Sequence, residues 1–133
     1  MSAIVVAWTP NEYGAAALDR GIVEARLRNL PLLVVNATRG DAYIDERFAG
    51  ASRIEELRAE LAQLDVEAEV QQGMGADVPD QLIAAAEDVG AEMIVIGVRH
   101  RTAVGKLLMG SVAQRVILEA TCPVLSVKPK GSA

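Results

Sequence analysis

Apolar and polar positions along this chain follow two alternating periods, which predicts strands and helices in regular succession. Apolar runs at residues 3–8, 31–36 and 93–97 are typical of strands buried on both faces, and a shorter run at 123–127 follows later. Between the runs, apolar residues recur every three or four positions, which is the period of an amphipathic helix. The helical stripes are Ala15, Leu18, Ile22 and Ala25; Ile54, Leu57, Leu61 and Leu64; Val78, Leu82, Ala86 and Val89; and Val112, Val116, Ile117 and Ala120. The pattern therefore predicts four helices between successive strands.

One further strand is predicted to have only one apolar face. Residues 66–71 alternate between apolar side chains and charged or amide side chains, which is typical of an edge strand. Residues 73–75 are then expected to form a loop because they contain two glycines. Pro123 at the start of the last apolar run also indicates an edge, since proline cannot donate to a central ladder. The two edges of the sheet are therefore predicted at 66–71 and 123–127.

Residues that favour helix starts precede three of the helical stripes. Asp77 is a predicted N-cap. Residues 9–12 fit a capping pattern that starts at Thr9, with Asn11 as an alternative cap. Ser111 stands three residues before Gln114, which predicts a second capping box.

This order of elements predicts an α/β fold in which residues 1–133 form a single doubly wound domain. We expect a Rossmann-like, five-stranded, mainly parallel sheet of order 3-2-1-4-5 with helices on both faces. In such sheets, ligands bind beyond the carboxyl ends of the strands, where the strand order reverses. With the first and fourth strands as central neighbours, that crevice lies between Trp8–Thr9 and Gly97.

A long basic loop joins the fourth strand to the last helix at this crevice. It begins at Gly97 and ends at Gly110 and Ser111, where the helix is predicted to start. Glycine lets a backbone approach a ligand closely, and a helix N-terminus offers N–H groups to an anion. The basic residues predicted around it are Arg99, Arg101, Lys106 and Arg115. The loop therefore favours an anion site, although an ordinary solvated loop would have the same composition.

Composition narrows the classes of function and of compartment. The net charge of −5 argues against general nucleic-acid binding. The only histidine, His100, and the only cysteine, Cys122, cannot form a zinc cluster within one chain, and Cys122 is expected to be a small packed side chain. The chain opens without a basic and apolar leader, and no apolar run reaches about 18 residues. We therefore expect a cytoplasmic protein without a membrane segment, a structural metal or a nucleic-acid partner.

The basic loop and the residues after it resemble those of universal stress proteins, and the resemblance covers essentially the whole chain. Nucleotide-binding members of that family carry Gly-x2-Gly-x9-Gly-Ser/Thr after the fourth strand, and here the pattern stands as Gly97-x2-His100-x9-Gly110-Ser111. The segments 111–116 and 122–127 are also similar to the family. The resemblance implies the doubly wound fold, a dimer and an adenine nucleotide whose phosphates lie in the glycine loop.

The resemblance also implies roles for individual positions. Thr9 stands where nucleotide-binding relatives usually have aspartate, so it offers a hydroxyl without a charge. His100 replaces the middle glycine, and a protonated imidazole there could attract phosphate. Trp8 could stack on a base or fill the wall of the crevice. The implied nucleotide-binding residues are Ala7, Thr9 and Ala37 near adenine and ribose, and Gly97, Arg99, His100, Gly110, Ser111 and Val112 in and after the loop.

Function is expected to be that of a small stress-response binding and signalling module. It would bind ATP, ADP or AMP, with Mg²⁺ in the case of ATP, and would pass the signal to an unknown regulatory protein. Because no general base is evident near a γ-phosphate, we expect at most slow ATP hydrolysis. Two alternatives stay open, namely a nucleotide-independent dimeric interaction protein of the same family and a weak ATPase.

The last strand also predicts how two copies pair. Val124, Leu125 and Val127 form a short apolar edge, and such an edge needs a partner or a cover. Related proteins pair through this strand, so the resemblance implies a homodimer with these residues at its interface.

Overall fold

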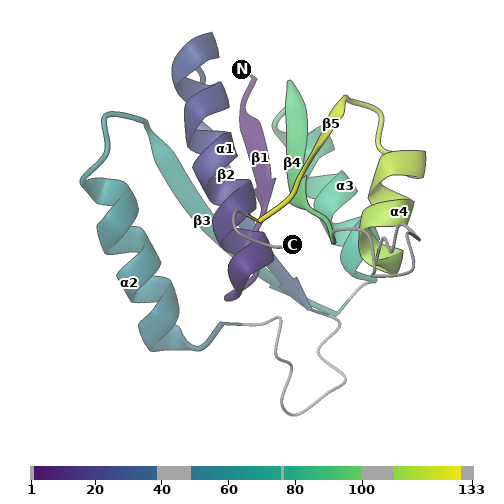
Figure 1. Ribbon diagram of the computed structural model, residues 1–133, viewed down its shortest axis with the longest axis horizontal. Coiled ribbons are helices and arrows are strands. Elements are labelled where there is room, and N and C mark those ends of the chain that lie inside the picture. The colour runs from purple at the N-terminus through teal and green to yellow at the C-terminus, as the bar shows by residue number, and fades with distance from the viewer. Residues whose placement is uncertain (1, 39–48, 76, 100–109, 130–133) are drawn as a thin grey trace.

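Five parallel strands form one sheet in the order β3-β2-β1-β4-β5, as predicted (Figure 1). The computed structural model describes residues 2–38, 49–75, 77–99 and 110–129. Its strands are β1 (Ile4–Ala7), β2 (Leu32–Thr38), β3 (Ala68–Met74), β4 (Met93–Gly97) and β5 (Val124–Val127). Its helices are α1 (Glu12–Arg28), α2 (Ala51–Ala62), α3 (Val78–Asp88) and α4 (Ser111–Glu119). No helix within these ranges is both long enough and apolar enough to cross a bilayer.

Two apolar cores lie on opposite faces of the sheet because neighbouring strand residues point to opposite sides. Val6 faces the core that α1 and α2 cover, whereas Val5 faces the core that α3 and α4 cover. Figure 1 shows these two layers of helices with the sheet between them. The central strands are buried on both faces, which is why their sequences are continuously apolar.

Three details of the predicted pattern are wrong. Gly73 and Met74 belong to β3 and do not form a loop, because β3 pairs with β2 along its whole length. Ala15 and Ile117 were expected on buried stripes, yet both are exposed. On α1 the buried stripe includes Glu24, which is 4% exposed and forms ion pairs with two arginines of the same helix. A pattern of apolar residues cannot identify such a buried position, because a charged residue can be buried when it is paired.

The structure confirms the alternative cap of α1, places Asp77 at the predicted N-cap position of α3, and contradicts the capping box at Ser111. Asn11, and not Thr9, is the N-cap of α1, and its side-chain oxygen accepts from the N–H groups of Tyr13 and Gly14. Gly110 is the N-cap of α4, so Ser111 is already helical and no capping box forms there. Asp77 stands at the N-cap position of α3, but its carboxylate makes no capping hydrogen bond among the described residues.

Candidate functional site

The reversal of strand order places a crevice at the carboxyl end of β1. Ala7 of β1 lies opposite Val35 of β2 on one side and opposite Ile96 of β4 on the other. After β1 the chain enters α1 on one face, and α4 covers the opposite face (Figure 1). The connections therefore diverge here, which is where doubly wound sheets bind their ligands.

Ala7 and Ala37 line the same face of the sheet at this end. Both pack on the side that α3 and α4 cover, where Ala37 is buried and Ala7 is half-buried. Their methyl groups are the smallest side chains that a strand can carry without weakening it as glycine does. The face that α3 and α4 cover is therefore low in side-chain volume at the ends of two neighbouring strands.

The N-terminus of α4 begins with Gly110 and Ser111 on that same side. No side chain among the described residues caps this helix. A methyl group built on Gly110 would meet no described atom within 4 Å, and Val112 turns its side chain to the core beneath. The first-turn N–H groups are thus free of a side-chain cap, as an anion site requires.

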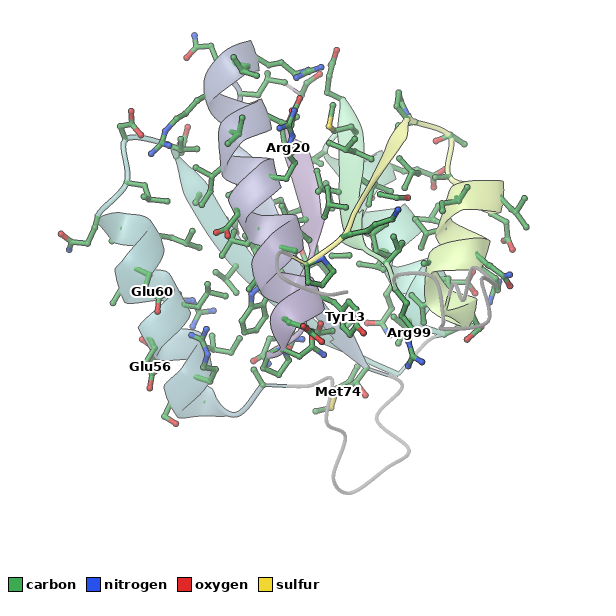
Figure 2. The ribbon with its side chains drawn as sticks, in the orientation of Figure 1. Tyr13, Arg20, Glu56, Glu60, Met74 and Arg99 are labelled. Atoms are coloured by element: carbon green, nitrogen blue, oxygen red, sulfur yellow. The ribbon has the colours of Figure 1, made fainter. Side chains whose placement is uncertain are left out.

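Gly97 has a different reason to be glycine. A methyl group on Gly97 would lie 2.4 Å from the carbonyl oxygen of Tyr13, so the first turn of α1 packs directly against the end of β4. Figure 2 shows Tyr13 at this end of the sheet. Gly14 is equally constrained, since a methyl group there would lie 1.8 Å from the carbonyl oxygen of Thr9. Both glycines serve the packing of α1 whether or not a ligand binds.

Thr9 lies just beyond β1 and takes part in the start of α1. Its hydroxyl donates to the Asn11 side-chain oxygen at 2.7 Å. The hydroxyl oxygen keeps its capacity to accept a hydrogen bond. Thr9 thus supports the cap from its place at the mouth of the crevice.

Among the predicted basic residues, Arg99 is exposed beyond β4, at the same end of the sheet as Tyr13 (Figure 2). His100 lies outside the described residues, as do Arg101 and Lys106. Arg115 does not join a free basic cluster, because Asp77, Asp80 and Glu119 all form ion pairs with it. The prediction that Arg115 belongs to the basic cluster was therefore wrong, because its charge is balanced by carboxylates of the same chain.

Trp8 fills the core and does not line the crevice. Its side chain is 3% exposed and packs with the residues between the sheet and α1 and α2. The Arg53 guanidinium lies over the indole ring, 5.2 Å from its centroid, a cation–π contact. Of the two interpretations of Trp8, the structure favours packing over stacking on a base.

Two side-chain amides that the sequence analysis did not single out, one buried and one half-buried, fix the strand ends around the crevice. Asn36 donates to the Trp8 carbonyl at 3.0 Å and accepts from the Ala49 N–H at 3.0 Å. Gln81 of α3 donates to the Thr38 carbonyl at 2.9 Å, which ties α3 to the end of β2. A polar residue inside an apolar run, as Asn36 is, was the available signal.

Comparison with known proteins agrees with this architecture. The family model of the universal stress protein family matches residues 1–128. A universal stress protein of Mycolicibacterium smegmatis is 48% identical over 128 residues, which are 96% of this chain and 98% of that protein.

Two solved structures extend the comparison. The structure of a universal stress protein from Archaeoglobus fulgidus has a TM-score of 0.80 at 32% identity and covers 96% of this chain and 99% of that one. A universal stress protein structure from the same organism, in complex with dAMP, has a TM-score of 0.67 at 30% identity, with 96% and 98% covered. From its sequence, its sheet order and these relatives, this chain belongs to the universal stress protein family.

Proposed function

We propose that this protein binds an adenine nucleotide in the crevice between β1 and β4. The observation that carries the proposal is the α4 N-terminus, where the described residues provide no side-chain cap and leave open space around Gly110. It lies on the same face of the sheet as Ala7 and Ala37. The dAMP complex of the Archaeoglobus fulgidus relative supports this ligand class.

Each part of the nucleotide would meet a different part of the crevice. The phosphates would accept from the N–H groups of Ser111 and Val112, and each charge-assisted hydrogen bond contributes about 1.5–3 kcal/mol. Arg99, which is exposed next to β4, would add positive charge, and His100 would do so when its imidazole is protonated. Adenine and ribose would lie at Ala7, Thr9 and Ala37, where small side chains leave room and Thr9 offers its hydroxyl.

The protein would act through occupancy and not through turnover. A bound nucleotide, with Mg²⁺ in the case of ATP, would neutralise the α4 N-terminus and alter the surface presented to a regulatory protein in the cytoplasm. Thr9 provides no carboxylate for a metal ion or a water molecule, so we expect hydrolysis to be slow at most.

Isothermal titration with ATP, ATP plus Mg²⁺, and AMP tests the proposal on the wild type and two glycine variants. Gly110→Val puts a branched side chain where phosphate would approach. Gly50→Val is a matched control, because Gly50 is the N-cap of α2, has an extended backbone like Gly110 and also has open space around it.

We expect saturable binding that Gly110→Val weakens at least about tenfold and Gly50→Val leaves unchanged. No detectable binding of the folded wild type at millimolar ATP would refute nucleotide binding and favour the nucleotide-independent interaction protein. Turnover of ATP that Ser111→Ala abolishes would instead favour the weak ATPase.

We also propose that two copies pair along β5. Val124, Leu125 and Val127 are only half-buried at this edge of the sheet. A groove of about 690 Å³ runs between β5 and α1, and apolar side chains form most of its lining. The apolar lining residues are Ala15, Ala16, Val23, Leu125, Val127 and Pro129. A second copy would cover an edge that is otherwise left open.

A further inference from the structure

Arg115 holds the start of α3 and the body of α4 together. Its Nη1 atom lies 2.5 Å from an Asp77 oxygen, and its Nη2 atom lies 3.1 Å from an Asp80 oxygen. Its Nε atom donates to Glu119, one turn further along α4, at 3.0 Å. We call these four residues the Arg115 clasp. In Figure 1 the two helices that it joins lie next to each other, and they are in contact.

The charge of Arg115 is saturated within the clasp. Hydrogen bonds with Glu119 and Asp77 raise the pKa of Arg115 further above its ordinary value, and Arg115 lowers the pKa of Glu119. Three carboxylates surround one guanidinium, so the cluster as a whole is negative. Acting through space alone, such a cluster would repel a phosphate group and not attract it.

α4 needs an anchor beyond its apolar contacts. It has nine residues, of which only Ala113 and Val116 are fully buried, while Leu118 is 81% exposed. A helix this short does not persist by itself, so its direction depends on tertiary contacts. The clasp holds it about one turn after Gly110 and Ser111, the residues that start the helix.

We propose that Arg115 is a positioning residue for the phosphate site, which acts by fixing the α4 N-terminus through Asp77 and Asp80. This inference rests on the proposed nucleotide function and assigns Arg115 a role without contact to the ligand. Preorganised N–H groups bind an anion more tightly because less ordering remains to be done on binding. The guanidinium fork suits this task, since it bonds several carboxylates in a fixed geometry.

The direction in which AMP affinity changes in two clasp variants separates a positioning role of Arg115 from direct attraction of phosphate. Arg115→Ala removes the clasp and the double variant Asp77→Asn with Asp80→Asn removes its ion pairs to α3, but the two variants change the local charge in opposite directions. If Arg115 positions α4, both variants weaken AMP binding by about fivefold to tenfold, and combining them adds little. If Arg115 attracts phosphate directly, removal of the two carboxylates strengthens AMP binding.

Two further measurements separate positioning from general damage to the fold. Adenosine, which has no phosphate, should bind all clasp variants as it binds the wild type. Hydrogen exchange in the apo protein should become faster in α4 but stay unchanged in β4. Arg58→Ala is a matched control, because Arg58 is also an exposed arginine paired with a carboxylate, Glu55, and its contacts lie at α2 and β3, away from α3 and α4.

The failures of the two proposals are distinguishable. A wild type that binds neither AMP nor ATP overturns the nucleotide function, and with it the role of the clasp at a phosphate site. A wild type that binds AMP, together with clasp variants that bind equally well or better, overturns the positioning role alone. Unchanged exchange of α4 in the clasp variants would also overturn it.

Discussion

At the scale of single residues, the two glycines at the ends of the basic loop have different surroundings. Gly97 abuts the Tyr13 carbonyl, so the packing of α1 alone requires that Gly97 has no side chain. Gly110 has open space around it among the described residues and an ordinary negative φ of −63°. The fold therefore explains the first glycine, whereas a ligand that approaches the backbone would explain the second.

Gly97→Ala should destabilise the fold itself. The added methyl group would lie 2.4 Å from a backbone oxygen that cannot rotate away, so α1 or β4 must shift. Overpacking of this kind costs about 1–3 kcal/mol, measured as the free energy of unfolding in urea. Gly110→Ala is the control and should change that free energy by less than about 0.5 kcal/mol. Equal stability of both variants would contradict the packing argument.

Cys122 should react slowly with thiol reagents in the folded protein. Its burial raises the pKa of the thiol, so the folded state keeps the proton at pH values where the unfolded chain has released it. Any stability from this group is complete below the unfolded pKa and declines as the pH rises through the folded pKa. When the reaction rate is measured as a function of pH, it should begin to rise at a higher pH for the folded protein in buffer than for the unfolded chain in urea. Identical profiles would show that burial has no effect.

At the scale of elements, the cap of α1 involves more residues than one N-cap. Asn11 accepts from two backbone N–H groups, while Thr9 supports Asn11 through its hydroxyl. The turn brings Gly14 against the Thr9 carbonyl, which fixes the start of α1 relative to the end of β1. The cap therefore shapes one wall of the crevice as well as starting the helix.

Asn11→Ala should cost about 1 kcal/mol of unfolding free energy, because two N–H groups lose their acceptor. Thr9→Val should cost less, since it removes only the hydroxyl that supports the cap. Urea denaturation of both variants at one pH measures the difference. A larger loss for Thr9→Val than for Asn11→Ala would mean that Thr9 carries the cap.

The sheet order and the two helical layers were predictable because they follow from periods that extend over many residues. The helix starts were less predictable, since residues 9–12 offer two acceptors and only the path of the backbone selects Asn11. The site was predictable as a location, at the strand-order reversal. Arg115 was misinterpreted because its partners Asp77 and Asp80 lie more than thirty positions away in sequence. No local pattern reports a pairing that only the fold creates.

At the scale of the whole molecule, the two edges of the sheet are protected to different degrees. At the β3 edge the exposed residues are polar except for Met74 at the end of the strand, and the Arg58 guanidinium reaches the Val70 carbonyl at 3.5 Å. Charged side chains of this kind discourage pairing with another strand. The β5 edge presents Leu125 and Val127 beside an apolar groove. Pairing of two copies is therefore expected at β5. In such a dimer, the β3 strand of each copy would remain as the exposed edge.

Leu125→Glu should convert the proposed homodimer to a monomer, because it places a charge at the centre of the β5 contact. Light scattering after gel filtration at micromolar concentration measures the mass, and circular dichroism shows whether the variant is folded. Leu118→Glu makes the same change at an 81% exposed leucine of α4, so it serves as the matched control. We expect that control to stay dimeric. A monomeric wild type would refute the dimer, and loss of the dimer in Leu118→Glu alone would move the contact to α4. If only Leu125→Glu dissociates, the contact runs along β5, and a second copy explains why the apolar residues of this strand are only half-buried within one chain.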